Sequence, residues 1–145
     1  MNSVVRELIF PCGPHASNSV DWVLLAVRVI FGTLLLVHGV QKVMSYNTLV
    51  TSFPDPIGLG SRLSLQLAIF AEVLCSLGVI SGLLFRLSLI PIIVTMSVAA
   101  FVAMKGAPWV QQELPVSYLL VYVLLMITGP GEYSLDGLIV RGFGG

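Results

Sequence analysis

Four apolar runs dominate this chain of 145 residues and constrain its fold more than any other feature. An α-helix needs about 20 residues to cross the ~30 Å hydrocarbon core of a bilayer. In lipid, segments of this length satisfy their backbone polar groups only as helices. We therefore predict an all-α fold, a transmembrane antiparallel four-helix bundle, with spans at residues 20–43, 63–85, 87–104 and 116–128.

Composition supports a membrane protein and excludes other classes. Only 10% of the residues are charged, against about 25% in soluble proteins, so a water-soluble globule is excluded. Seven basic and seven acidic residues leave no net charge, and no basic cluster is present, so nucleic acid is excluded as a partner. The lipid bilayer is the expected surrounding.

The runs divide the chain into an N-terminal tail (1–19), a four-helix membrane domain (20–131) and a C-terminal tail (132–145). Four spans put both termini on one side of the membrane. Counting Lys and Arg does not decide which side, because each side carries three of them. They are Arg6, Arg86 and Arg141 on the terminal side and Lys42, Arg62 and Lys105 on the other.

Two charges interrupt the first two runs. Arg28 lies inside the first and Glu72 inside the second. An ionisable side chain near the centre of a membrane helix costs about 2.5–3.5 kcal/mol on insertion scales. Counting from the helix ends leaves the two side chains about 7–8 Å apart along the bundle axis. We predict that Arg28 and Glu72 form a buried pair, directly or through water.

Other polar residues are expected near the end of the bundle remote from the termini. His38 and Lys42 lie late in the first span, Asp55 lies in the following loop, and Glu113 precedes the fourth run. Small residues in one stripe let a neighbouring helix approach closely, and Gly32 and Gly39 share a stripe with Arg28. These features predict a polar cavity that serves as a ligand site, lined by Arg28, His38, Lys42, Asp55, Glu72 and Glu113.

Simpler interpretations of the same residues remain open. The Arg28–Glu72 pair can act only to fix helix register. His38 can be an interfacial histidine held by hydrogen bonds rather than a proton carrier. Tyr118 and Tyr122, four residues apart, are expected to pack within the bundle rather than bind a ligand.

The connection from Ser45 to Arg62 is predicted to be a structured loop between helices 1 and 2. Pro54 and Pro56 restrict the backbone on either side of Asp55. Ser61 is the expected N-cap of the second helix. With only two histidines in the chain, we expect no metal site and no covalently bound cofactor. Any redox group is then a diffusible quinone or belongs to a partner protein.

Several of these residues form a recognisable pattern. Arg28, Phe31-Gly32, His38-Gly39 and Lys42 resemble the first-helix signature of the DoxX family of small four-helix membrane proteins. The resemblance covers about residues 22–138. It continues through FPDPIGLGS at 53–61, Phe70-Ala71-Glu72-Val73, Gly82 to Arg86, Thr95-Met96, Ala99, Glu113 and Gly129-Pro130-Gly131 with Tyr133 to Asp136.

This resemblance implies a multi-pass protein of the cytoplasmic (inner) membrane with cytoplasmic termini. It also implies a quinone-linked subunit of a membrane redox complex, with another redox protein as partner, because the family is named after a quinol oxidase subunit. Two alternatives remain: a non-enzymatic scaffold or assembly partner, and a pathway for small solutes or protons. Enzymatic activity and oligomeric state are not predicted.

A quinone head group is expected between His38 and Glu72, the proton-exchanging side chains partway down the bundle. Arg28 would keep Glu72 ionised. Replacement of His38 should therefore weaken quinone binding more than Tyr118→Phe does.

Overall fold

The protein was analysed as a computed structural model that describes residues 18–143. These residues contain helices and no strand, which confirms the all-α prediction. The first span is α2 (Asn18–Met44), and the short α3 (Tyr46–Leu49) follows it. The second span is continuous through α4 (Ser61–Ile69), the π-helical η1 (Phe70–Cys75) and α5 (Ser76–Ser81). The third span consists of α6 (Phe85–Val98) and the π-helical η2 (Ala99–Ala103). The fourth span is α7 (Trp109–Thr128), and the last helix is α8 (Leu135–Phe143).

Four of these helical segments are long and apolar enough to cross a membrane. Their outward faces carry large apolar side chains, such as Leu74 on η1 and Ile127 on α7, which are 60% and 71% exposed. Such surfaces are stable against lipid rather than water. The most hydrophobic 18-residue part of each span has less than half of its residues buried within the bundle, so most of the apolar surface faces outward.

The fourth span begins earlier than the hydrophobic pattern indicated. Helix α7 starts at Trp109 and passes through Pro115 without ending. Gln112 stabilises the preceding turn, because its side-chain amide donates to the carbonyls of Met104 (2.8 Å) and Ala107 (3.0 Å). The polar residues before Val116 are therefore part of the helix.

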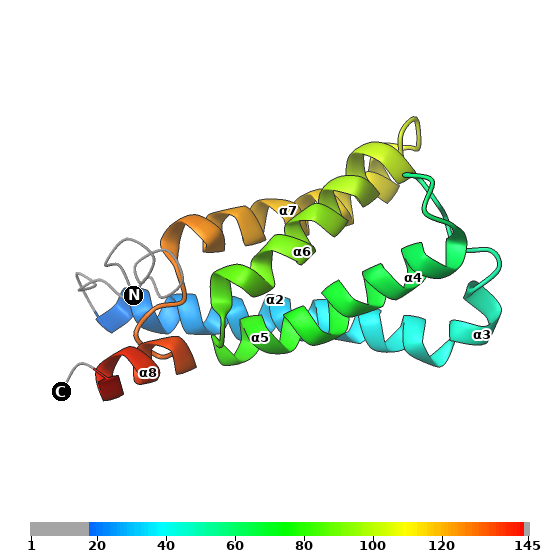
Figure 1. The fold of residues 1–145 in the computed structure, drawn as a ribbon. Coiled ribbons are helices and arrows are strands. Elements are labelled where there is room, and N and C mark those ends of the chain that lie inside the picture. Colours follow the sequence, from blue (N-terminus) through cyan, green and yellow to red (C-terminus); the bar gives the residue numbers. More distant parts are fainter. Residues whose placement is uncertain (1–17, 144–145) are drawn as a thin grey trace.

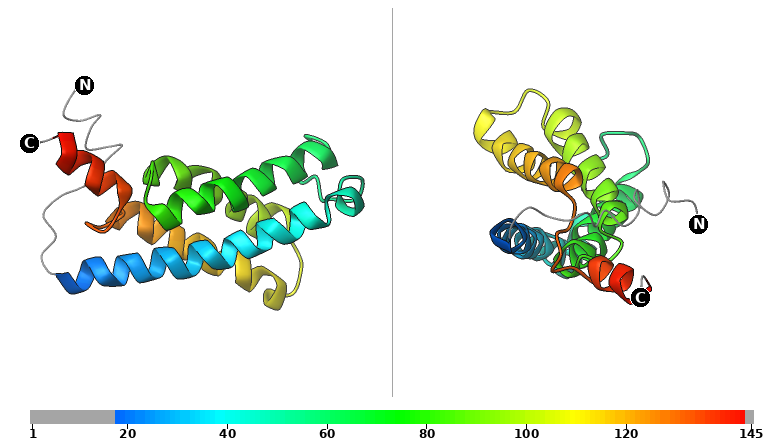
Figure 2. Two further views of the ribbon diagram at one scale, coloured as in Figure 1. Left: turned by 90° about the horizontal axis from the view of Figure 1, so that it is seen from below. Right: turned by 90° about the vertical axis from the view of Figure 1, so that its left-hand side faces the viewer.

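The four spans form two pairs that meet at one end and diverge at the other. Helix α2 packs along α5 and η1, and α6 packs along α7. Figure 1 shows α6 lying close to α5 near the end where α2 begins, and separating from α4 toward the opposite end. Figure 2 shows the two pairs along the length of the bundle. We call the end that holds the start of α2 and helix α8 the terminal end, and the other the loop end.

Arg28 holds the terminal end together through backbone carbonyls. Its guanidinium donates to the carbonyl oxygens of Pro130, Tyr133 (2.9 Å) and Ile80 (3.2 Å). Ile80 lies in the last turn of α5, and Pro130 follows α7 directly. The last carbonyls of a helix lack intrahelical partners and carry partial negative charge, so a buried cation is stabilised there.

The predicted Arg28–Glu72 pair is therefore wrong. The antiparallel register sets Gly39, not Arg28, beside Glu72, because a Cβ at Gly39 would lie 2.9 Å from the Glu72 backbone. Gly39 is eleven residues beyond Arg28, about 16 Å along a helix. The prediction counted from helix ends assumed to lie level, whereas Gly32, well inside α2, already faces Ile80 in the last turn of α5. Helix α2 therefore extends past the second span at the terminal end.

A carboxylate complements Arg28 at the same end. Asp136 is fully buried and accepts hydrogen bonds from the backbone N–H groups of Leu84 (2.8 Å) and Phe85 (2.9 Å). These N–H groups belong to the start of α6, where the helix dipole favours a negative charge. Gly82 lies close to this contact, because its carbonyl accepts a hydrogen bond from the Asp136 N–H. Its φ of 69° favours glycine, and a Cβ at this position would lie only 2.5 Å from the Cβ of Ser134.

The segment after α7 is more ordered than a tail. We expected residues 132–145 to form a C-terminal tail outside the bundle, but Ser134 and Asp136 are buried and α8 runs to Phe143. Asp21 of α2 joins the segment by accepting a hydrogen bond from the Glu132 N–H (3.0 Å). Most of the expected N-terminal tail, 1–19, lies outside the described residues.

The two glycines of the α2 stripe should differ in their tolerance of alanine. A Cβ at Gly39 would meet the Glu72 backbone at 2.9 Å, whereas one at Gly32 would meet the flexible Ile80 side chain at 2.6 Å. We expect Gly39→Ala to lower the free energy of unfolding by about 1–3 kcal/mol and Gly32→Ala by less. Thermal unfolding of the two purified variants in one detergent measures this, and an equal or larger loss for Gly32→Ala would contradict the described helix approach.

Candidate functional site

A cavity of about 600 Å³ lies between the two helix pairs at the loop end. Its walls come from α2, α4 with η1, α6 with η2, α7 and the loop that follows α3. Most of the lining side chains are apolar, among them Leu35, Phe53, Ile57 and Met96. Ligand sites of this size are commonly apolar with a few polar groups that fix orientation.

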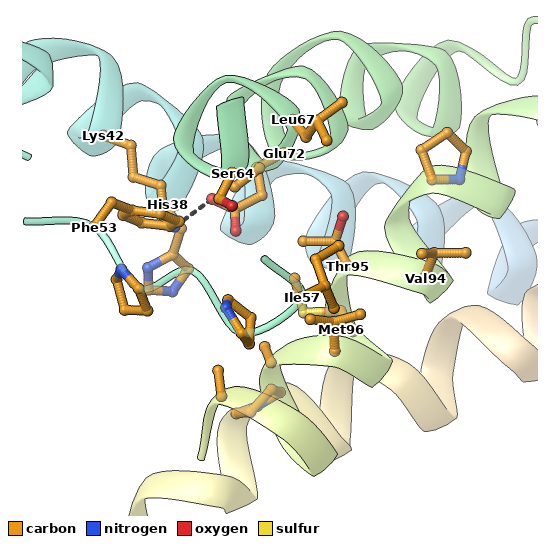
Figure 3. A pocket seen from close by; sticks show the side chains of 18 of the residues that line it. His38, Lys42, Phe53, Ile57, Ser64, Leu67, Glu72, Val94, Thr95 and Met96 are labelled. Carbon is orange, nitrogen blue, oxygen red and sulfur yellow. Dashed lines mark hydrogen bonds and ion pairs between the residues drawn. The ribbon is translucent and has the colours of Figure 1, made fainter. Parts of the chain in front are cut away.

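The charged groups of the cavity lie together at one side. Lys42 of α2 and Glu72 of η1 form an ion pair of 2.5 Å, with their side chains 25% and 6% exposed. Figure 3 shows His38, Lys42 and Glu72 on this side, with Val94, Thr95 and Met96 of α6 facing them. Lys42, not Arg28, is thus the cation that compensates Glu72, and it reaches the carboxylate from a position nearer the membrane surface.

Three further polar side chains lie in the cavity wall without hydrogen-bond partners among the described residues. They are the His38 imidazole, the Tyr118 hydroxyl and the Thr95 hydroxyl. The rings of His38 and Tyr118 meet edge to face, with centroids 6.1 Å apart. Although Tyr118 is only 4% exposed, its hydroxyl is not among the fully buried polar atoms that lack a partner. A ligand in the cavity could therefore form a hydrogen bond with any of these three groups.

Tyr118 was expected only to pack within the bundle, and the structure also places it in the cavity wall. Its ring does pack, stacking on Tyr122 at a centroid distance of 6.0 Å. The Tyr122 hydroxyl donates to the Phe31 carbonyl (2.9 Å) and is used within the core. Only Tyr118 lines the cavity, and the i,i+4 spacing could not distinguish the two tyrosines.

Asp55 does not line the cavity but fixes the loop that covers it. Its carboxylate accepts hydrogen bonds from the N–H groups of Leu59 and Gly60, both at 2.8 Å, and from the Ser64 hydroxyl at 3.0 Å. These bonds, the Gly60 one foremost, lower the pKa of Asp55 below its usual value. A lowered pKa in the folded state means that the contribution of Asp55 to loop stability is present above its unfolded pKa and is lost as the pH falls through its folded pKa.

The expected capping of the second helix is also different. Ser61 is the first residue of α4, Gly60 occupies the N-cap position, and no side chain caps this helix directly. Asp55 reaches the Leu59 and Gly60 amides from the preceding loop instead. Its flanking prolines, Pro54 and Pro56, line the cavity.

The structure brings together three of the six predicted site residues. His38, Lys42 and Glu72 line the cavity, whereas Arg28, Asp55 and Glu113 do not. Glu113 is exposed on α7, and its neighbours Leu114 and Pro115 form the wall. Within residues 18–143, no three His, Cys, Asp or Glu side chains come together to form a possible metal site.

The sequence profile of the DoxX family matches residues 23–105, more than half of the chain. The chain belongs to the DoxX family. Its similarity extends to a curated relative, the uncharacterized membrane protein Rv3486 of Mycobacterium tuberculosis, which is 28% identical over 137 residues that cover 77% of this chain and 78% of the relative. No solved structure matches the chain.

In this DoxX protein, the Glu72-bearing turn is π-helical. Segment η1 spans Phe70 to Cys75, and η2 forms a second π-helical turn at the cavity wall. π-Helical turns within α-helices are frequent at functional sites. Here η1 also meets Gly39 closely, so the carboxylate is held where α2 and the second span approach each other closely.

Replacing Lys42 and replacing Glu72 should destabilise the protein by different amounts. Lys42→Met leaves Glu72 buried without a cation, whereas Glu72→Gln leaves Lys42, whose flexible stem can extend to interfacial water. We expect Lys42→Met to lower the free energy of unfolding of this DoxX protein by about 1–3 kcal/mol, and Glu72→Gln by less. The measurement is unfolding of both variants and the double variant in one detergent.

The double variant tests the coupling directly. Combining the two substitutions should recover stability to the level of Glu72→Gln, since no unpaired carboxylate remains. A double variant as unstable as the sum of both single changes would show that the two side chains are not coupled.

Proposed function

We propose that this DoxX protein binds a membrane quinone and serves as a quinone-linked subunit of a redox complex. The observation that supports the proposal is the cavity, whose largely apolar wall contains a few polar groups, among them His38, Tyr118, Thr95 and the Lys42–Glu72 pair. A quinone has the matching chemistry, because an apolar ring and tail accompany two carbonyl oxygens that accept hydrogen bonds. Family membership alone would not support this assignment.

The unpaired polar groups fit the head group of such a ligand. The Tyr118 hydroxyl can donate a hydrogen bond to a quinone carbonyl, and so can one nitrogen of His38. Both side chains line the cavity and lack partners among the described residues. A ligand that accepts these hydrogen bonds should bind more tightly than a purely apolar one, because an apolar ligand would cover the donors without offering them an acceptor.

The ionisable groups on the same side can exchange the protons of quinone chemistry. Oxidation of a hydroquinone to a quinone releases two protons and two electrons. An imidazole and a carboxylate can each accept and donate a proton, and His38 and Glu72 place one of each in the cavity wall. This chain would bind the head group and handle protons, while a separate redox protein would take up or supply the electrons.

A pathway for solutes or protons through the bundle has less support than a ligand site that is closed at the terminal end. At the terminal end, Phe85, Tyr122 and Arg28 are each at most 1% exposed, and none of them lines the cavity. A continuous route for solutes would have to pass this packed region. The scaffold alternative makes no use of the cavity and is separated from the proposal by a binding measurement.

Quinone binding should be saturable and should depend on His38. We expect purified protein to retain quinone through extraction and, once stripped, to bind a soluble benzoquinone analogue. His38→Ala should weaken binding about tenfold, the effect of one lost hydrogen bond of ~1.4 kcal/mol. Lys105→Ala is the matched control, because Lys105 is exposed at the same end and outside the cavity. Equilibrium dialysis against empty micelles measures both variants.

The outcomes separate the two functional classes. Protein without co-extracted quinone and without saturable analogue binding would favour the scaffold. Tyr118→Phe serves as a second cavity variant rather than a neutral comparison, because it removes a hydroxyl that has no other described partner.

We propose a location in the cytoplasmic membrane, with both termini in the cytoplasm. The four candidate spans are consistent with this orientation, which comes from the family resemblance because the basic residues are balanced. A fluorescent reporter that matures only in the cytoplasm, fused after residue 145, should fluoresce, whereas a periplasm-dependent phosphatase at the same point should be inactive. The opposite pattern would reverse the orientation and place the cavity in the cytoplasmic leaflet.

A further inference from the structure

Two stripes of apolar side chains mark the outer surface of the second and third spans. Their members recur every three or four residues, except for one step of seven from Val94 to Phe101, which is the spacing of one helix face, and all are at least 45% exposed. The first stripe contains Leu63, Leu67, Phe70, Leu74 and Leu77, and the second contains Leu87, Ile90, Val94 and Phe101. In a membrane-spanning bundle these stripes face lipid.

The cavity reaches this lipid-facing surface. Leu67, Phe70 and Val94 belong to the stripes and also line the cavity, whereas Leu74 and Ile90 belong to the stripes only. The three shared residues come from facing elements, since Leu67 lies on α4, Phe70 begins η1 and Val94 lies on α6. The cavity therefore has an apolar rim between α4 and α6.

The fold explains why an opening exists here. Helix α6 packs on α5 and η1, so the second and third spans touch there and separate toward the loop end, as Figure 1 shows. Phe53, Pro54 and Ile57 of the connecting loop line the cavity from the loop end. This apolar loop covers the route toward water, while the side between α4 and α6 borders the hydrocarbon region.

We infer that the gap between α4 and α6 is a subsite for the hydrocarbon tail of a lipid-soluble ligand, which enters from the loop-side leaflet. The inference rests on the proposed function, because the polar side near His38 and Glu72 then holds the head group. Leu67, Phe70 and Val94 contact the tail where it leaves the bundle. The affinity for a tailed ligand thus depends on this rim, whereas the affinity for the bare head group does not.

A pair of probes that differ only in the tail tests this assignment. One is a benzoquinone with a ten-carbon alkyl tail, and the other is the same ring without the tail. Leu67→Trp and Val94→Trp fill the rim, and Leu74→Trp is the matched control on the same lipid-facing stripe outside the cavity. Binding is measured by equilibrium dialysis in one detergent, with correction for uptake by empty micelles, on variants that retain the thermal stability of the parent.

The expected result is selective for the tailed probe. Leu67→Trp and Val94→Trp should weaken its binding at least about tenfold and change binding of the tailless ring less than about twofold, while Leu74→Trp changes neither. Unchanged binding of the tailed probe in both rim variants overturns the subsite, and so does an equal loss for both probes. If parent protein binds neither probe, the proposed function itself fails.

A second measurement locates the tail independently of affinity. A tailed benzoquinone with a photoreactive group at the tail end should label peptides of α4 and α6 that contain Leu67 or Val94. Another part of the cavity wall, where Leu114 of α7 is a lining residue exposed by 51%, offers the alternative exit. Labelling at Leu114 with none at Leu67 or Val94, together with a tail-selective loss in Leu114→Trp, would place the exit beside α7 and overturn the inference.

Discussion

The contact of Arg28 with three backbone carbonyls is the interaction on which the architecture depends. It joins α2, the end of α5 and the segment after α7, which lie far apart in sequence. An arginine can satisfy such a cluster because its planar group carries five N–H donors. Asp136 complements it at the start of α6. A buried cation is thus stabilised by carbonyls at the end of α5 and in the segment after α7, and a buried anion by a helix N-terminus, without a direct ion pair.

This arrangement closes one end of the bundle and leaves the other end wider. At the loop end, an apolar loop fixed by Asp55 covers the cavity. The Lys42–Glu72 pair lies between these regions, at the level where Gly39 lets α2 approach η1. The cavity therefore exists because the spans pack closely at the terminal end and less closely at the loop end. Its charged groups lie in the part of the wall where η1 holds Glu72 beside α2.

The asymmetry connects the fold to the proposed function. A site that is closed toward the terminal end and bordered by lipid-facing residues suits a ligand dissolved in the bilayer better than a solute that crosses it. The family match assigns the chain to the DoxX membrane proteins. The chemistry proposed for this chain rests instead on His38, Tyr118 and Glu72 in the cavity wall.

The sequence by itself determined the helical class, the number of spans and the close approach at Gly39, because hydrocarbon thickness and backbone hydrogen bonding leave few alternatives for long apolar runs. It also identified Arg28 and Glu72 as exceptional, since each carries a charge that lipid disfavours. Only the tertiary structure decided their partners. Helical periodicity fixes which residues share a face but not the axial register between helices, and that register gave Glu72 to Lys42 and Arg28 to the carbonyls of distant segments.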